Sequence, residues 1–198
     1  IIVTCANQTN GKGRGENSWY SLNGAITMSC LLSPGESVTT IPLKVGLFIS
    51  NFFKEKFNKD IFLKWPNDLM TKDHKKVGGI ICHLIDNKIV VGIGINLVED
   101  PSFEKQSFKW DTVKIEPNLI KQDQLSLNLY EFLLKNQSKT FRPQEWSERC
   151  SHLNKKVEIK DEFSSTKGVF IGVSEIGEAI IQEKNKITNV ISGSLFIS

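Results

Sequence analysis

The sequence lacks the features of a small secreted domain and of a membrane protein. It has four cysteines in 198 residues and no Cys-x-x-C pair, and three of the cysteines lie within apolar runs. This spacing favours reduced, buried thiols in a cytoplasmic protein over disulfides. The longest apolar run, residues 89–98, is too short to cross a bilayer, and no signal peptide is visible. The chain begins without methionine, so a fragment or a processed product is expected.

An excess of charge of one sign is also missing. Lysine and arginine number 25 and aspartate and glutamate 22, a formal net charge of +3. This excess is too small to predict a nucleic-acid partner, but it suits an anionic small molecule or an acidic partner protein. His74, His83 and His152 show no metal-ligand spacing, so no metal site is predicted. Hydrophobic residues make up 39%, which is enough for a packed core.

Apolar periodicity predicts an α+β fold, with a mixed sheet against which helices pack. Asp86-Asn87 between two apolar runs is typical of a tight hairpin turn. Residues 99–124 are polar and are expected to be irregular. Strands are expected at residues 1–6 (buried), 24–32, 61–64, 77–85 and 88–97, and helices at about 42–53, 125–133 and 142–153.

The pattern changes after about residue 154. Short alternating runs follow, separated by Gly168, Gly177 and Gly193, and they predict a small antiparallel sheet resembling a barrel. We therefore expect two domains, residues 1–153 and residues 154–198.

A glycine-rich loop, Gly11-Lys12-Gly13-Arg14-Gly15, follows the first predicted strand. Glycines let the backbone approach a ligand, and successive free amides beside two cations can bind a phosphate or a carboxylate. The spacing matches neither a Rossmann nor a Walker A motif, and a solvated loop is the alternative. Trp19, which follows, is either a core aromatic or a flat surface for an adenine.

A second motif is Lys64-Trp65-Pro66-Asn67-Asp68. Pro66 ends the preceding strand, which places Lys64 rigidly at a strand end where it could stabilise a developing anion. A surface lysine followed by turn residues is the alternative.

Two predicted strands carry glycines, in residues 76–80 and 92–96. Glycine inside a strand marks close approach of a ligand or of another backbone. Two such places on paired strands predict a bare sheet face for a flat ligand, with β-bulges as the alternative.

In this order, the four segments resemble the biotin–protein ligases, including the eukaryotic holocarboxylase synthetases. The resemblance covers residues 1–97 and, more loosely, the C-terminal part. It implies a class II synthetase-like fold followed by a small SH3-like β-barrel domain. The family also has an upstream segment with Ser/Thr-rich biotin contacts, before the point where this chain starts. Some members have a DNA-binding helix-turn-helix, which this sequence does not contain. Some bacterial members carry an acidic residue near their C-terminal end, and the corresponding segment here, Gly193-Ser194-Leu195-Phe196, lacks it.

The resemblance implies site residues position by position. Lys64, Arg14 and Lys12 would be the catalytic cations. The biotin contacts would fall on Gln8, Lys12, Gly13, Arg14, Lys64 and Gly79. The ATP or adenylate contacts would fall on Gly11, Trp19, Asn67 and Asn96.

The implied reaction has two halves. The biotin carboxylate attacks the α-phosphorus of ATP, which gives biotinyl-AMP and pyrophosphate, with Mg²⁺ shielding the triphosphate. A lysine of a biotin carboxyl carrier domain, part of a biotin-dependent carboxylase, then attacks the mixed anhydride. Catalysis would rest on positioning and electrostatics, without a protein nucleophile. A homodimer is left open. The alternatives are a lipoate–protein ligase, a protein that only binds biotin or its adenylate, and an RNA-contacting module.

Overall fold

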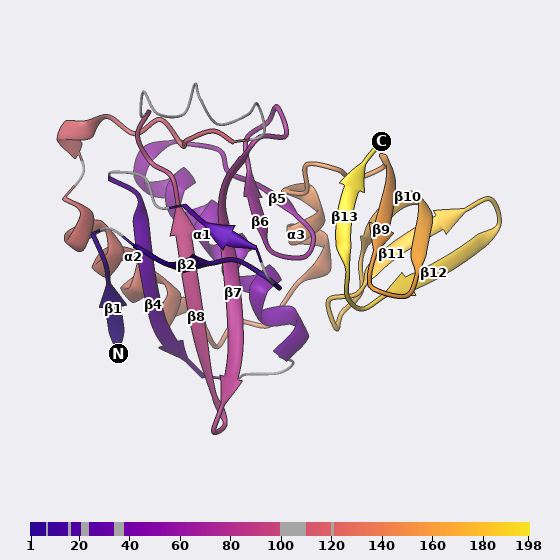
Figure 1. The fold of residues 1–198 in the computed structure, drawn as a ribbon, viewed down its shortest axis with the longest axis horizontal. Helices are drawn as coiled ribbons and strands as arrows, with labels where there is room; N and C mark the ends of the chain where they lie inside the picture. The colour runs from indigo at the N-terminus through magenta and orange to yellow at the C-terminus, as the bar shows by residue number, and fades with distance from the viewer. Residues whose placement is uncertain (7, 16, 21–23, 34–37, 100–109, 120) are drawn as a thin grey trace.

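The computed structural model describes residues 1–6, 8–15, 17–20, 24–33, 38–99, 110–119 and 121–198. Its strands form a six-stranded sheet, a five-stranded sheet and a two-stranded ribbon (Figure 1). The two longest helices pack together on one face of the six-stranded sheet. None of the helices in the described part of the chain has the length and hydrophobicity of a membrane span.

The six-stranded sheet contains the two glycine-bearing strands near its centre. Every neighbouring pair of its strands is antiparallel, and within the described ranges parallel pairing occurs at two single bridges, Leu63–Cys150 and Lys76–Trp110. In sheet order, the strands are β1 (Ile2–Thr4), β4 (Ile26–Leu32), β8 (Lys88–Ile95), β7 (Lys76–Ile85), β6 (Asp68–Met70) and β5 (Phe62–Lys64).

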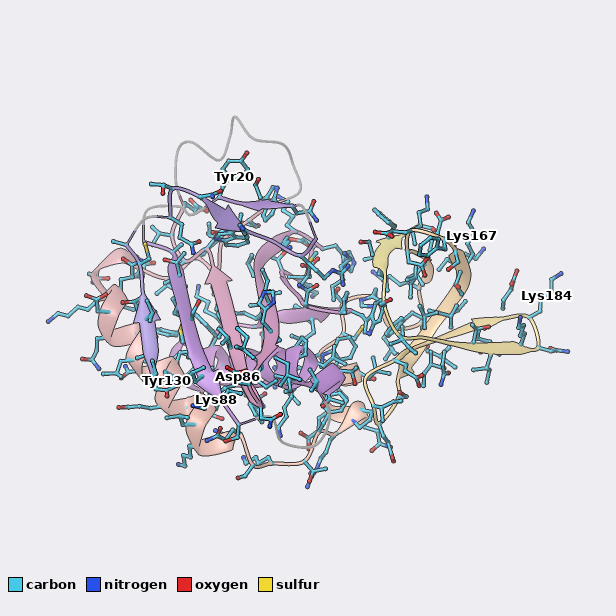
Figure 2. The ribbon with its side chains drawn as sticks, turned by 60° about the horizontal axis from the view of Figure 1, so that its bottom comes forward. Tyr20, Asp86, Lys88, Tyr130, Lys167 and Lys184 are labelled. Atoms are coloured by element: carbon cyan, nitrogen blue, oxygen red, sulfur yellow. The ribbon has the colours of Figure 1, made fainter. Side chains whose placement is uncertain are left out.

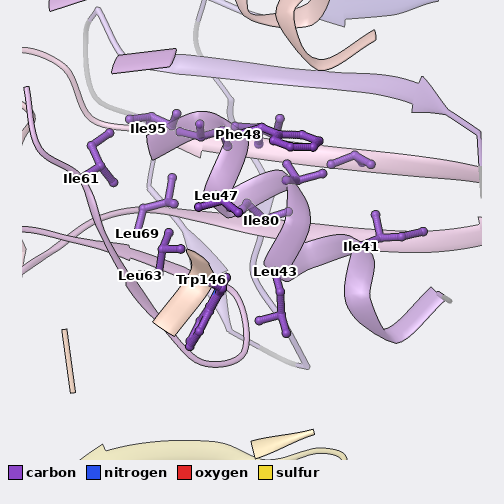
Figure 3. Close-up of a cluster of buried hydrophobic side chains, with 14 of the residues drawn as sticks. Ile41, Leu43, Leu47, Phe48, Ile61, Leu63, Leu69, Ile80, Ile95 and Trp146 are labelled. Carbon is purple, nitrogen blue, oxygen red and sulfur yellow. The ribbon is translucent and has the colours of Figure 1, made fainter. Parts of the chain in front are cut away.

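Helix α1 (Ile41–Phe57) supplies much of the core. A proline stands in its first turn, and Asn58, in the left-handed conformation, ends it. Its apolar stripe faces the sheet, so that Leu47 and Phe48 pack near Ile80 and Ile95 (Figure 3). Among the residues that the structure describes, the other helical segments are α2 (Gln122–Asn136), α3 (Pro143–Glu148) and two short 3-10 turns, Val38–Thr40 and Pro117–Leu119.

The hairpin between β7 and β8 confirms the predicted turn at Asp86-Asn87. Both residues have positive φ, 46° and 59°, the conformation that a two-residue type I′ turn requires. The turn fixes the register of two long strands, and Gly79 therefore lies opposite Gly94. Asp86 and Lys88 mark the end of this hairpin in Figure 2.

The C-terminal strands form a five-stranded antiparallel sheet, as predicted for a small barrel-like unit. The expected boundary between residues 153 and 154 lies between α3 and this sheet, and it stays a prediction. The strands are β12 (Lys186–Val190), β11 (Ala179–Glu183), β10 (Ser165–Val173), β9 (Lys156–Lys160) and β13 (Ser194–Ile197), in sheet order.

The turn between β10 and β11 connects the five-stranded sheet to the first half of the chain through hydrogen bonds. The buried indole of Trp65 donates a hydrogen bond to the Gly177 carbonyl at 3.0 Å, and Thr39 Oγ1 donates to the Ile176 carbonyl at 2.5 Å. Gly177 has φ +86°, and a Cβ on it would lie 3.0 Å from the Thr39 carbonyl oxygen. The contact thus depends on a glycine and on the tryptophan next to Lys64.

Three expectations need correction. β1 is an exposed edge strand, with Val3 62% exposed, because it pairs only with β4. Cys5 is exposed as well, whereas Cys30 is buried. The third helix ends at Glu148 instead of residue 153, because the backbone then pairs with Leu63, whose N–H donates to Arg149 and whose carbonyl accepts from Ser151.

His152 links the two halves of the chain and makes stability depend on pH. It is fully buried, its ring centroid lies 4.3 Å from that of Phe170, and its Nδ1 lies 3.2 Å from Cys150 Sγ. Burial, reinforced by the positive charges of Lys64 and Lys155, lowers the pKa of His152 from 6.5 to about 3. The folded state therefore binds this proton less readily than the unfolded state does.

We expect the resulting stabilisation to be fully present above pH 6.5 and to be lost as the pH falls toward 3. The expected slope is about 1.4 kcal/mol per pH unit. Urea unfolding between pH 4 and 7 measures it, and His152→Gln should flatten the curve even if it lowers stability overall. His83→Gln, at an exposed position, is the matched control. An unchanged slope in His152→Gln would refute the assignment.

Candidate active site

A cavity of about 310 Å³ lies on the face of the six-stranded sheet opposite α1. Along β7 and β8 the side chains alternate, so residues such as Ile80 and Ile95 face the helix while Gly79, Gly92 and Gly94 face the cavity. The two-stranded ribbon, β2 (Gly11–Lys12) and β3 (Ser18–Trp19), crosses in front of these strands (Figure 1).

The floor of the cavity is bare backbone, as the strand glycines predicted. A Cβ on Gly92 would meet its nearest neighbours, the Ile81 carbonyl oxygen and Ser29 Oγ, at 3.9 Å, an ordinary van der Waals contact that leaves room for a side chain. A Cβ on Gly94 would lie 2.6 Å from the Trp19 ring, so this indole rests directly on the strand. Gly92 therefore leaves the floor of the cavity without a side chain, and Gly94 allows the Trp19 ring to pack directly on β8.

The glycine-rich segment is more ordered than the expected loop. Its ends pair as Gly11↔Trp19 and Lys12↔Ser18, and Gly13 N–H donates to the Asn17 carbonyl at 2.6 Å. Asn17 Nδ2 donates to the Arg14 carbonyl at 2.8 Å. This tight turn aims two cations, Lys12 and Arg14, at the cavity, which both of them line.

The Lys64–Asp68 segment forms the turn of the β5–β6 hairpin. Lys64 and Asp68 are cross-strand partners, and Lys64 Nζ lies 3.3 Å from Asp68 Oδ2. The other oxygen, Oδ1, lies 2.5 Å from the Nζ of Lys76, which lines the cavity. One carboxylate thus holds two half-buried ammonium groups together.

Lys76 is a site residue that sequence reasoning missed. It opens the glycine-bearing segment 76–80, but nothing local showed that its ammonium group would reach Asp68 and lie 5.4 Å from the centroid of the Trp110 ring. Asp68 also acts on the loop: partial desolvation lowers the pKa of Arg14, and the Asp68 carboxylate opposes this shift.

Asn67 locks the same turn onto β7. Its backbone carbonyl accepts from the N–H of Ile80 at 3.0 Å, and its Nδ2 donates to the Ile80 carbonyl at 2.8 Å. Asn67 lines the cavity, but these bonds commit its amide nitrogen to holding the hairpin.

Several buried polar atoms have no hydrogen-bond partner among the described residues. Trp19 Nε1, Asn96 Oδ1 and Thr112 Oγ1 are three of them. Trp110 packs edge-on against Trp19, with ring centroids 5.9 Å apart. An unpartnered donor and acceptor beside aromatic rings suit the polar edge of a flat heterocycle.

The predicted site residues divide into two groups. Three do not line the cavity: Gly11, Lys64 and Asn96. Gly11 instead packs against the Trp19 carbonyl and Gln8 Oε1, Lys64 forms an ion pair with Asp68, and Asn96 is buried just after β8. The lining contains Gln8, Lys12, Gly13, Arg14, Trp19, Asn67 and Gly79.

Comparison with known proteins shows which family this chain resembles. Residues 1–100 match the model of the biotin/lipoate A/B protein ligase family. The chain belongs to this family. The match takes in both glycine-bearing strands, the glycine-rich loop and the Lys64–Asp68 hairpin, while the five-stranded sheet lies outside it.

Named relatives within the biotin/lipoate ligase family are biotin–protein ligases. Biotin–protein ligase 2 of Arabidopsis thaliana is 33% identical over 103 residues, which are 47% of this chain and 31% of that protein. The bifunctional ligase/repressor BirA of Escherichia coli is 22% identical over 210 residues, covering 95% of this chain and 63% of BirA. The chain thus spans about a third of the Arabidopsis relative.

A solved structure resembles the whole chain. The biotin protein ligase of Aquifex aeolicus, determined in complex with biotin and ATP, is 30% identical with a TM-score of 0.82. The similarity covers 100% of this chain and 89% of that one. The α+β fold with its C-terminal strands is therefore that of a biotin ligase.

Proposed function

We propose that this chain carries the catalytic site of a biotin–protein ligase, which adenylates biotin with ATP and transfers it to a lysine of a biotin carboxyl carrier domain. The observation that carries the proposal is the cavity itself: a bare glycine floor bordered by Lys12, Arg14 and Lys76. An apolar ring system fits the floor, and a carboxylate or phosphate fits the cations. The biotin ligases among its relatives support the choice of substrate.

In this proposal the site has a biotin side and an adenine side. Biotin lies along Gly79 and Gly92 under the glycine-rich loop, with its carboxylate toward Lys12 and Arg14. The adenine lies toward Trp19 and Asn96, whose unpartnered polar atoms are available to it. Gln8 and Gly13 complete the biotin side, and Gly11 and Asn67 support the walls.

The chemistry needs charge stabilisation but no protein nucleophile. A biotin carboxylate oxygen bonds to the α-phosphorus of ATP, and the bond to pyrophosphate breaks. The carrier amine then bonds to the activated carbonyl carbon, loses a proton and expels AMP. Arg14 and Lys76 border the cavity and can offset the negative charge that accumulates on the phosphate. Lys64, which shares Asp68 with Lys76, adds its positive charge from just outside the cavity.

Mg²⁺ enters this scheme with the nucleotide. Asp68, the carboxylate beside Lys76, is already bridged by two lysines, and the described residues contain no cluster of three or more His, Cys, Asp or Glu side chains that could hold a metal. The ion is therefore part of the Mg·ATP substrate in this proposal, where it shields the triphosphate.

The proposed setting is the cytoplasm, with the carrier domain of a biotin-dependent carboxylase as partner. None of the four cysteines, all of them in the described part of the chain, forms a disulfide, which suits a reducing compartment. A homodimer is compatible with the exposed edge strand β1.

Calorimetry with biotin and with lipoate, each with and without Mg·ATP, tests the proposal. We expect heat of binding with biotin, tighter binding in the presence of Mg·ATP, and no binding of lipoate. Pyrophosphate release should require both substrates. Lipoate binding without biotin binding would make the chain a lipoate ligase instead. Binding of both substrates without pyrophosphate release would make it a binding-only protein.

A further inference from the structure

The glycine-rich loop contacts the five-stranded C-terminal sheet through the side chain of Arg14. Arg14 Nη2 donates a hydrogen bond to the Gly193 carbonyl at 2.5 Å and another to Ser194 Oγ at 3.1 Å. Ser194 begins β13, 180 residues further along the chain. The cation that borders the cavity is therefore held by a unit outside the sheet that forms the cavity floor.

The two acceptors are held firmly in place. Gly193 has φ +141°, and a Cβ on it would lie 2.6 Å from Ile159 Cγ2 and 3.0 Å from the Lys160 carbonyl. Ser194 pairs with Lys160 in the antiparallel ladder of β13 and β9. Only glycine lets this turn pack so closely on β9, and the packing directs the Gly193 carbonyl at Arg14.

The C-terminal sheet that carries these two acceptors also contacts the Lys64–Asp68 hairpin. The same C-terminal sheet accepts the hydrogen bond of Trp65 Nε1 through Gly177, and Trp65 follows Lys64 directly. The C-terminal sheet thus contacts Arg14 of the glycine-rich loop and also Trp65, the residue next to Lys64. These two contacts fix the spacing between the loop and the hairpin.

Both acceptors are uncharged. A carboxylate at this point would neutralise Arg14, whereas a carbonyl and a hydroxyl hold the guanidinium and leave its positive charge in place. A guanidinium has five N–H donors in a planar fork. Contact through Nη2 is therefore compatible with further bonds from the same group to an anion in the cavity.

We infer that Gly193 and Ser194 are positioning residues for the reaction, which hold the guanidinium of Arg14 at the edge of the cavity without reducing its charge. The inference rests on the proposed function for its catalytic consequence, but the contact itself exists without substrate. Loss of the Ser194 hydroxyl should leave Arg14 held by the Gly193 carbonyl alone and loosen the β2–β3 ribbon, and binding should weaken more than the chemical step.

Hydrogen–deuterium exchange in the substrate-free protein tests the contact. We expect the amides of residues 11–14 to exchange about 5-fold faster in Ser194→Ala, since one hydrogen bond is lost. Ser194→Thr, which keeps the hydroxyl, should exchange as the parent does. Ser165→Ala is the matched control, because Ser165 Oγ is an exposed hydroxyl of the same sheet that bonds Glu158 instead. Equal exchange in Ser194→Ala and the parent protein would overturn the inference.

Steady-state pyrophosphate release tests the catalytic consequence. Ser194→Ala should raise the KM for biotin about 5-fold with kcat within about twofold, again the effect of one hydrogen bond. In an Arg14→Ala background the same change should have no further effect, because the two residues act through one contact. An undiminished effect in that background would overturn the inference. Because the exchange measurement needs no substrate, it separates failure of the contact from failure of the proposed function.

Discussion

Replacing Lys64 by alanine is expected to slow adenylate formation by about 100-fold or more, the usual cost of removing one preorganised group that stabilises transition-state charge. The Lys64 side chain is 19% exposed and its ammonium lies 3.3 Å from Asp68. Its loss removes one cation directly. It also leaves the Asp68 carboxylate balanced by Lys76 alone, which lowers the net positive charge beside the cavity that Lys76 lines. Pyrophosphate release under saturating substrates measures the effect.

Lys54→Ala is the matched control for Lys64→Ala. Lys54 also pairs with an aspartate, Asp60, at 3.0 Å, but it is exposed at the end of α1, outside the lining of the cavity. We expect this variant to keep the parent rate. Both variants should show unchanged circular dichroism, because neither lysine belongs to the apolar core. Parent-like pyrophosphate release by Lys64→Ala would rule out the assigned role.

Replacing Gly92 by valine should weaken biotin binding by about 100-fold, near the upper end of the 1–3 kcal/mol that overpacking costs. A Cβ at this position meets nothing closer than 3.9 Å in the folded chain. Valine is also favoured in strands, so the sheet should keep its stability. The added methyl groups occupy the space over the cavity floor where the ring system is proposed to lie. Calorimetry with biotin measures the loss.

Gly92→Ala provides a graded comparison, with an expected loss of about 10-fold because it adds one methyl group instead of three heavy atoms. Thermal unfolding of both variants should stay within a few degrees of the parent protein. Parent-like affinity in Gly92→Val would show that biotin does not lie on this floor. A large drop in unfolding temperature would instead show that the glycine serves packing.

Local patterns in the sequence predicted much of the architecture, because the responsible interactions are short-range. Asp86-Asn87 predicted a two-residue turn, since both residue types tolerate positive φ. The apolar stripe after Pro42 predicted the helix, whose partners needed only to be apolar. The strand glycines predicted a bare face, because period-two alternation puts Gly92 and Gly94 on one side.

Burial was harder to predict where it depended on neighbours. Residues 1–6 have the composition of a core strand, yet β1 lies at the edge of its sheet with Val3 exposed. Lys64 was expected to border the cleft itself, but it contacts Asp68 and leaves the cavity edge to Lys76. In both cases, the outcome depends on which strands lie alongside, and local composition does not specify them.

The sequence by itself determined the chemistry that this chain can offer: a glycine-bearing floor, two loop cations and a lysine at a strand end, in the order typical of the biotin ligases. Tertiary structure alone decided how these groups combine. Asp68 joins Lys64 to Lys76 across β6 and β7, and Gly193 and Ser194 hold Arg14 from 179 and 180 residues away. The first pairing forms only when β5, β6 and β7 align in one sheet, and the second only when the two sheets pack together. Hydrogen bonds and ion pairs act over a few ångströms, whatever the separation along the chain.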